Sequence, residues 1–142
     1  MSKQVILLVE DNEDDIDLTL RALKRHHIAN KVIVARDGVE AIILLFEESS
    51  VFSVELPSVV VLDLNMPKMG GLDVLRRIRS EPRTRELPVV VLTTSDEERD
   101  IVESYKLGAN SYVRKPVEFE AFENAIQHLG LYWLILNVPP KR

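Results

Sequence analysis

Residues 59–71, VVVLDLNMPKMGG, place an aspartate at the end of a run of branched apolar residues. A continuous apolar run is typical of a strand buried on both faces, as in a parallel sheet covered by helices. Asp63 ends the run, and three residues that favour turns follow it: Pro67, Gly70 and Gly71. A carboxylate beside so much apolar surface is costly unless something compensates its charge. Other segments of the chain must therefore bring a cation to Asp63.

Five apolar segments have the pattern of strands, and most are continuous rather than alternating. They are Gln4 to Val9, Lys31 to Ala35, Ser58 to Leu62, Pro88 to Leu92 and Ser111 to Val113. Segments with helical spacing of apolar residues follow each of them. These are Glu13 to about His26, Gly38 to about Glu48, Leu72 to about Ser80, Asp96 to Leu107, and Val117 onward. The alternation predicts one doubly wound α/β domain with a parallel sheet and right-handed crossovers.

The composition suits a single globular domain, with 46% hydrophobic and 29% charged residues in a chain of 142. The absence of cysteine excludes disulfides and thiolate chemistry and fits a reducing cytosol. No segment has the pattern of a signal peptide or a membrane span, so we expect a cytoplasmic protein that does not bind membranes. A net charge of -5 without a basic stripe disfavours nucleic acid. We expect a protein partner.

Polar side chains stand where the predicted strands end. The first strand ends in Glu10 and Asp11, the third in Asp63 and the fourth in Thr93, and Lys115 follows the fifth. In open parallel sheets, ligands bind at this edge. If the first and third strands are neighbours, three carboxylates meet there, and two charges about 4 Å apart repel by roughly 4 kcal/mol at an effective dielectric near 20.

Two cations can balance these carboxylates: the ammonium of Lys115 and a divalent ion. Mg²⁺ suits one or two carboxylates together with waters and phosphate oxygens. A purely structural salt-bridge cluster is the alternative, although the hydroxyl of Thr93 adds a phosphate donor that a salt bridge does not need. The nearby acids Asp14, Asp15 and Asp17 are interpreted as first-turn residues that favour the positive end of a helix dipole.

The joint spacing of four segments resembles the receiver domain of two-component response regulators, across residues 3–130. The segments are LLVEDN, VLDLNMPKMGGLDVLRRIR, PVVVLTTS and GANSYVRKP. The resemblance implies a flavodoxin-like sheet of strand order 2-1-3-4-5 with five flanking helices. It also implies a signalling protein that is not an enzyme beyond its own phosphotransfer and autodephosphorylation.

The resemblance implies a role for each acidic residue at the strand ends. Asp63 would accept a phosphoryl group from a histidine of a sensor kinase. Asp11 and Asp63 would bind Mg²⁺ together with the backbone carbonyl of Asn65, while Glu10 would help through water. A carboxylate is a competent nucleophile toward phosphorus once the charge that it meets is neutralised.

Three further residues take roles by the same resemblance. Thr93 would donate to the bound phosphoryl group, Lys115 would pair with it, and Tyr112 would be the aromatic switch. Two positions depart from common forms of the family: Glu10 stands where aspartate is also frequent, and Thr94 stands where alanine is often found. Neither departure removes a required group.

Three other classes of protein share parts of this pattern. A phosphatase with an aspartate nucleophile would need a second aspartate two residues after Asp63, where this chain has Asn65. A nucleotide or flavin module would need a glycine-rich phosphate loop after the first strand, and none follows it. A receiver-like interaction module that is never phosphorylated would not need the complete set of site residues.

Residues 131–142 form an apolar appendage to the predicted domain. One helical stripe of apolar residues passes through Gly130, and further apolar residues beyond it occupy the other faces. We expect this segment to make a homodimer through Tyr132, Trp133 and Ile135. The alternative is that it folds back as a strand on its own domain.

The two ends of the chain resemble a narrower group within the family. VEDNEDDIDLT near the start and YWLILNVPP near the end are similar to the single-domain regulators that are paired with cyanobacterial phytochromes. This likeness makes a bacterial phytochrome a candidate for the sensor kinase.

Overall fold

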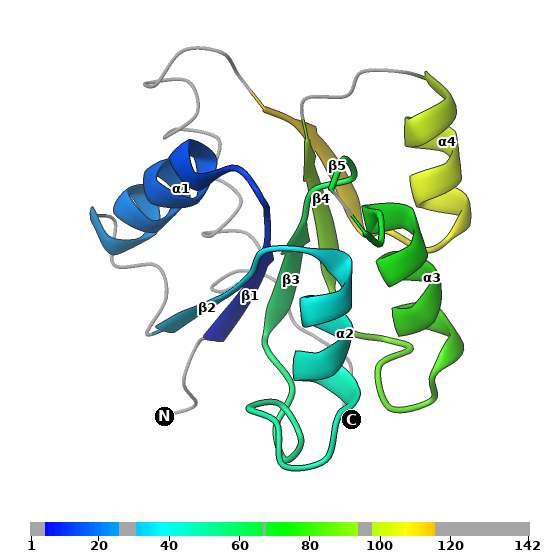
Figure 1. Ribbon diagram of the computed structural model, residues 1–142. Helices are drawn as coiled ribbons and strands as arrows, with labels where there is room; N and C mark the ends of the chain where they lie inside the picture. Colours follow the sequence, from blue (N-terminus) through cyan, green and yellow to red (C-terminus); the bar gives the residue numbers. More distant parts are fainter. Residues whose placement is uncertain (1–4, 26–30, 67, 94–97, 116–142) are drawn as a thin grey trace.

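Strands and helices alternate along the chain in the computed structural model, which describes residues 5–25, 31–66, 68–93 and 98–115 (Figure 1). The strands are β1 (Val5–Val9), β2 (Lys31–Ala35), β3 (Val59–Leu62), β4 (Val89–Thr93) and β5 (Ser111–Arg114). The helices in these ranges are α1 (Glu13–Arg25), α2 (Gly38–Phe46), α3 (Gly71–Ser80) and α4 (Glu98–Lys106).

The strands form one sheet in the order β2-β1-β3-β4-β5, and every neighbouring pair is parallel. The predicted doubly wound sheet and its strand order are therefore confirmed. In Figure 1, α1 lies on one side of the sheet, and α2 and α3 lie on the other. The predicted fifth helix and the apolar extension with Tyr132, Trp133 and Ile135 fall outside the described residues.

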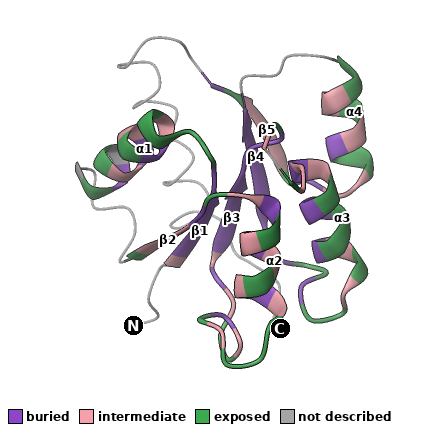
Figure 2. Cartoon of the chain, viewed as in Figure 1, coloured by how far each residue is buried: buried purple, intermediate pink, exposed green. Residues whose placement is uncertain are grey.

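The core consists of two clusters, because alternate residues of each strand face opposite sides of the sheet. The cluster between the sheet and helices α2 and α3 includes Leu7, Val9, Ala41, Leu45, Val60, Leu62, Val74, Leu75 and Ile78. The cluster on the α1 side includes Ile6, Leu8, Leu23, Val59, Val61, Val90 and Leu92. Figure 2 shows the three central strands buried on both sides, which explains their continuous apolar runs. Within the described ranges, no helix is long and apolar enough to cross a bilayer.

The observed boundaries lie within two residues of the predicted ones wherever both ends are described. Strand β4 continues through Thr93, one residue further than predicted, because Thr93 pairs with Arg114 of β5. Helix α2 stops at Phe46, since Glu47 already has an extended backbone. Helix α3 begins at Gly71 rather than at Leu72.

Arg79, near the C-terminus of α3, forms hydrogen bonds with two loops at the amino ends of the strands. This edge of the sheet is opposite the edge where the carboxyl ends lie. Its guanidinium donates to the carbonyl of Gly108 from Nε at 2.9 Å and from Nη2 at 2.7 Å. It also donates to the carbonyl of Leu87 at 2.7 Å and to the side chain of Asn110 at 2.9 Å. The backbone of Gly108 has φ +95°, which a residue with a side chain rarely adopts.

Candidate functional site

The backbone register brings the predicted site residues to one edge of the sheet. The N–H of Asp63 donates to the carbonyl of Val9 at 3.0 Å, which sets Asp63 beside the neighbouring Glu10. At the other side, the N–H of Lys115 donates to the carbonyl of Thr93 at 2.7 Å. The side chains that follow strands β1, β3 and β5 therefore meet at the carboxyl ends of the strands, where ligands bind in folds of this kind.

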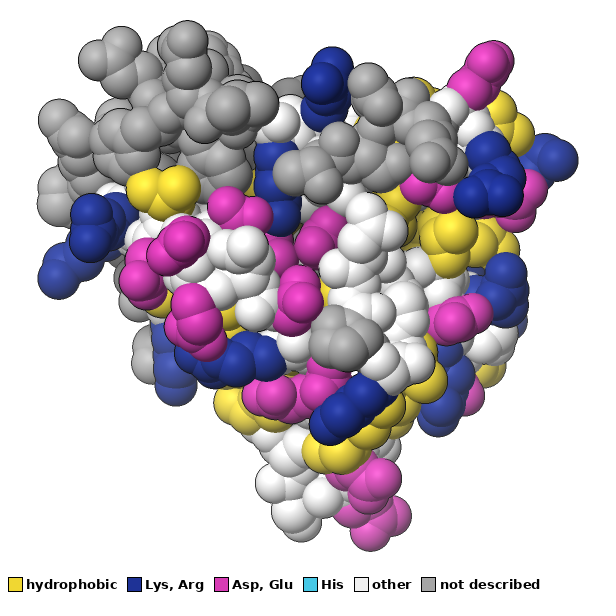
Figure 3. Space-filling model, turned by 45° about the horizontal axis from the view of Figure 1, so that its top comes forward, with side chains coloured by type: hydrophobic (Ala, Val, Ile, Leu, Met, Phe, Trp, Pro, Cys, Tyr) yellow, Lys and Arg dark blue, Asp and Glu magenta, His cyan; other side chains and the backbone are white. Residues whose placement is uncertain are grey.

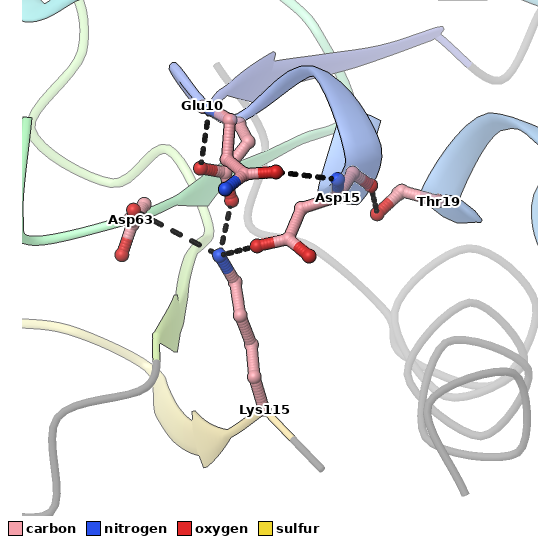
Figure 4. Close-up of polar contacts among 6 residues, drawn as sticks. Glu10, Asp15, Thr19, Asp63 and Lys115 are labelled. Atoms are coloured by element: carbon pink, nitrogen blue, oxygen red, sulfur yellow. Dashed lines mark hydrogen bonds and ion pairs between the residues drawn. The ribbon is translucent and has the colours of Figure 1, made fainter. Parts of the chain in front are cut away.

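Lys115 is the cation at the centre of this edge (Figure 4). Its ammonium forms an ion pair with Glu10 and donates to Oδ2 of Asp15 at 2.8 Å. It lies 3.8 Å from Oδ2 of Asp63. The side chain of Lys115 is only 5% exposed, so these charges interact with little screening by solvent. Lys115 thus supplies part of the positive charge that these carboxylates require.

The ammonium does not neutralise all of the buried acidity. Burial raises the pKa of Glu10 to about 7, and the charge of Asp63 adds to this, while the hydrogen bond from Lys115 works against it. Burial also opposes the charge of Lys115, but its hydrogen bonds to Asp15 and Glu10, together with the charges of Asp63 and Glu10, outweigh burial and raise the pKa of the lysine. The site therefore sets one ammonium against the carboxyl groups of Glu10, Asp15 and Asp63.

Glu10, Asp11 and Asp63 form a cluster with the geometry of a cation site. One oxygen from each carboxylate lies within 4.8 Å of the others. Glu10 and Asp63 are buried, whereas Asp11 is exposed. Hard oxygen ligands with surplus negative charge fit a divalent cation such as Mg²⁺ or Mn²⁺.

An open pocket of about 420 Å³ gives access to these groups. Its lining consists of Glu10, Asp11, Asn12, Asp15, Asp63, Asn65 and Lys115. Figure 3, which looks toward this edge, shows acidic side chains gathered on the same face. A larger pocket of about 640 Å³ lies among residues 54–56 and 82–86, away from these acids. The carboxylates and Lys115 therefore open into the smaller pocket.

Two glycines keep the loop after Asp63 close to the site. A Cβ at Gly71 would lie 2.2 Å from the carbonyl oxygen of Asp63, so α3 can begin there only without a side chain. A Cβ at Gly38 would lie 2.3 Å from the carbonyl oxygen of Met69, so the start of α2 presses on the same loop. Lys68 in this loop has a positive φ of 66°, and its Nζ lies 3.4 Å from Oδ2 of Asp37, the residue before α2. Gly71 was predicted as a turn residue, and the structure shows that close packing also demands it.

Asp15 is the site residue that sequence reasoning missed. It was interpreted as a first-turn acid of the helix, and α1 does begin at Glu13 with Asn12 as its cap. The structure shows in addition that the carboxylate of Asp15 reaches Lys115. Helical spacing gave no signal for this contact, because Asp11 precedes the helix and Lys115 lies 100 residues further along the chain.

The two predicted switch residues lie beside the pocket rather than in its lining. Thr93 is fully buried at the end of β4 and is tied to Lys115 through the backbone. Tyr112 is half-buried in β5 and packs against the core cluster on the α2 and α3 side. The structure thus brings Glu10, Asp11, Asp63, Asn65 and Lys115 together, with Thr93 adjacent.

Comparison with known proteins identifies the class. The family model of the response regulator receiver domain matches residues 6–127, and the chain belongs to that family. The predicted resemblance is confirmed. Response regulator Rcp1 of Synechocystis sp. is 37% identical over 131 residues, which make up 92% of this chain and 89% of Rcp1.

Solved structures agree in fold over nearly the whole chain. The Mn²⁺-bound form of Rcp1 is 36% identical with a TM-score of 0.89, covering 97% of this chain and 99% of that one. The phosphorylated cyanobacterial phytochrome response regulator RcpA is 36% identical with a TM-score of 0.92, covering 99% and 100%. The bacteriophytochrome response regulator AtBRR is 48% identical with a TM-score of 0.73, covering 97% and 100%. The predicted likeness to phytochrome-associated regulators is confirmed by these relatives.

Proposed function

We propose that Asp63 is the phosphoacceptor of this response regulator and that a histidine of a sensor kinase is the donor. The observation that carries the proposal is the position of Asp63, buried between the ammonium of Lys115 and two further carboxylates at the open edge of the sheet. A nucleophile toward phosphorus needs a fixed carboxylate and nearby positive charge, and this edge supplies both.

The reaction is an exchange of one bond at phosphorus for another. An Oδ atom of Asp63 attacks the phosphorus of the phosphohistidine, the phosphorus–nitrogen bond breaks, and its electron pair stays on the imidazole. Lys115 places its charge beside the oxygens of the transferred group. Water later attacks phosphorus, the bond to Asp63 breaks, and inorganic phosphate leaves with the carboxylate restored.

The cation of the site is proposed to be Mg²⁺, held by Glu10, Asp11, Asp63 and the backbone carbonyl of Asn65. Three carboxylate oxygens that lie within 4.8 Å support this set, and the Mn²⁺-bound structure of Rcp1 is in keeping with it. When bound, a divalent cation neutralises charge on the phosphoryl oxygens and the attacking carboxylate. The surplus acidity around Glu10 provides the electrostatic reason for binding.

The output is proposed to run through Thr93 and Tyr112. A phosphoryl group on Asp63 would attract the hydroxyl of Thr93, and Tyr112 would follow into the space released, because a ligand shifts an equilibrium through contacts made in one state only. The receiver domain is taken as residues 3–130 and the apolar extension as residues 131–142. That extension is proposed to form a homodimer through Tyr132, Trp133 and Ile135.

The names of the relatives support a bacterial phytochrome as the sensor kinase. The family transmits signals rather than catalysing a metabolic reaction, and a phosphatase would need an aspartate in place of Asn65. The cytoplasmic location predicted from the sequence goes with a kinase partner and stays a prediction.

The central experiment is phosphorylation by a small phosphodonor such as acetyl phosphate, followed by mass spectrometry of the intact protein. The wild type should gain one phosphoryl group in the presence of Mg²⁺ and none after chelation. Asp63→Asn should gain none, while Asp73→Asn, an exposed acid on α3, should behave as the wild type. Phosphorylation that persists in Asp63→Asn would contradict the proposal, and repeated release of phosphate from simple monoesters would favour a phosphatase.

Dimerisation is tested by sedimentation of the full chain and of the double variant Tyr132→Ala, Trp133→Ala. The wild type should sediment as a dimer at micromolar concentration and the variant as a monomer. A monomeric wild type would rule out the proposed interface.

A further inference from the structure

Lys115 is shared among three carboxylates, and one of them lies outside the proposed cation set. Asp15 comes from helix α1, whereas Glu10 and Asp63 directly follow strands β1 and β3. We propose that Asp15 is a positioning residue that holds the ammonium of Lys115 away from Asp63 until a phosphoryl group competes for it. The inference rests on the proposed function. It adds a residue that shifts the equilibrium between the unphosphorylated and phosphorylated states of the protein.

The distances favour Asp15 over Asp63 as the resting partner of the lysine. Nζ of Lys115 is 2.8 Å from Oδ2 of Asp15 and 3.8 Å from Oδ2 of Asp63. Only the first of these two contacts is a hydrogen bond. In Figure 4 the lysine side chain rises from the end of β5 and its ammonium lies between the two carboxylates. A small displacement of the ammonium therefore exchanges one carboxylate for the other.

The backbone around Asp15 is fixed, so its carboxylate is presented by a rigid element. Its N–H donates to Oδ1 of Asn12 at 3.0 Å, and its carbonyl accepts from the hydroxyl of Thr19 at 2.7 Å. Asn12 is in turn held by Glu10, whose Oε2 accepts from the Asn12 N–H at 3.2 Å. A residue anchored in this way can hold its partner at a defined position.

In the unphosphorylated protein, Lys115 donates no hydrogen bond to Asp63. This arrangement affects cation binding and retention of the phosphoryl group in opposite directions. An ammonium drawn toward Asp15 leaves the oxygens of Asp63 more available to a divalent cation. The same ammonium must leave Asp15 to reach a phosphoryl group, which carries a charge of about -2 and attracts it more strongly than one carboxylate does. Asp15 therefore favours cation binding and disfavours retention of the phosphoryl group.

The test compares Asp15→Asn with Asp14→Asn. Both acids belong to the first turn of α1, and both substitutions remove one negative charge, but the side chain of Asp14 is exposed. Affinity for Mg²⁺ is measured by calorimetry on the unphosphorylated protein. Lifetime of the phosphoryl group is measured after removal of acetyl phosphate, by mass spectrometry.

Asp15→Asn should bind Mg²⁺ about 2-fold to 5-fold more weakly and retain the phosphoryl group longer by a similar factor, the size expected for a partly exposed ion pair. Asp15→Glu should restore both values toward those of the wild type, which a general loss of structure would not permit. Asp14→Asn should change neither property beyond the small effect of one distant charge.

Three outcomes would overturn the inference. One is an Asp15→Asn protein that matches Asp14→Asn in both measurements. Another is a change of both properties in the same direction, which would mark a general disturbance of the site. The third is a wild type that takes up no phosphoryl group on Asp63, and this result alone would also contradict the proposed function.

Discussion

Gly71 lies directly against the backbone of Asp63. An ideal Cβ at position 71 would come within 2.2 Å of the Asp63 carbonyl oxygen and 2.8 Å of the Leu64 Cα. The N–H of Gly71 donates to the carbonyl of Leu64 at 3.0 Å. The first turn of α3 is thus hydrogen-bonded to the backbone that carries the proposed phosphoacceptor. Gly70, one residue earlier, has no such constraint, since its Cβ would lie 3.5 Å from the nearest atom.

Gly71→Ala should destabilise the protein by about 1–3 kcal/mol, because the added methyl group must displace backbone rather than a flexible side chain. Gly70→Ala is the matched control, and it should cost less, about 0.5–1 kcal/mol, because alanine is a poorer N-cap than glycine but meets no backbone at this position. Unfolding in urea measures both. Equal losses in the two variants would show that the close approach to Asp63 is not what requires glycine.

Arg79→Met should lower the free energy of unfolding by about 2–4 kcal/mol, because it leaves the carbonyls of Leu87 and Gly108 without their charged donor. The apolar stem of the side chain is kept. Arg76→Met is the control on the same helix, where Arg76 is exposed and pairs with Asp73. That variant should stay within about 0.5 kcal/mol of the wild type. Similar losses of stability in the two variants would show that the hydrogen bonds of Arg79 to the two loops do not stabilise the fold.

In the absence of divalent cations, the free energy of unfolding should fall as the pH rises from about 4.5 to about 7. The pKa of Glu10 rises from 4.5 to about 7 on folding, so within this window the folded state keeps a proton that the unfolded state has lost. Proton binding to the folded state stabilises it below pH 4.5, and this stabilisation is lost through pH 7, by at most about 3 kcal/mol. Urea titrations in a chelating buffer measure the slope.

Glu10→Gln should flatten this pH dependence. Glu13→Gln is the control, because the hydrogen bond and charge of Arg36 lower the pKa of Glu13 and move its titration below the window. A wild type whose stability rises between pH 4.5 and 7 would contradict the assigned direction for Glu10.

Mg²⁺ should stabilise the folded protein at pH 8, by about 2.7 kcal/mol at a concentration 100 times the dissociation constant. Asp11→Asn should abolish most of this gain, because Asp11 belongs to the cluster of three carboxylates. Asp17→Asn, an exposed acid on α1, should keep it. Thermal unfolding with and without a chelator provides the measurement. A gain that is equal in Asp11→Asn would place the cation elsewhere.

The sheet and much of its edge could be predicted from the sequence, because both depend on local patterns. Runs such as VVVL ending at Leu62 are continuous because β3 is buried on both faces, and the polar residue after each run must lie at the strand end. That rule alone predicts that the carboxylates of Glu10, Asp11 and Asp63 lie close together. Their cluster needed no knowledge of how the helices pack.

Contacts made by helices across the sheet could not be predicted in the same way. Asp15 and Lys115 are 100 residues apart, and their contact depends on the angle at which α1 crosses the sheet edge. That angle is set by buried residues such as Ile16 and Leu23, whose spacing predicts a helix but not its orientation. The packing constraint on Gly71 was hidden for a similar reason, since a turn explains the same residue equally well.

The ion pair between Lys115 and Glu10 joins residues 105 positions apart, and it has a consequence for the order of folding. During synthesis, every acid of the pocket leaves the ribosome before the lysine does. An incomplete chain that ends within β4 carries Glu10, Asp11 and Asp63 with mutual repulsion and without their ammonium, so the docking of β1 against β3 is opposed at that edge. The arrival of β5 removes the opposition. The positive charge of the pocket is therefore supplied only when the last described strand joins the sheet.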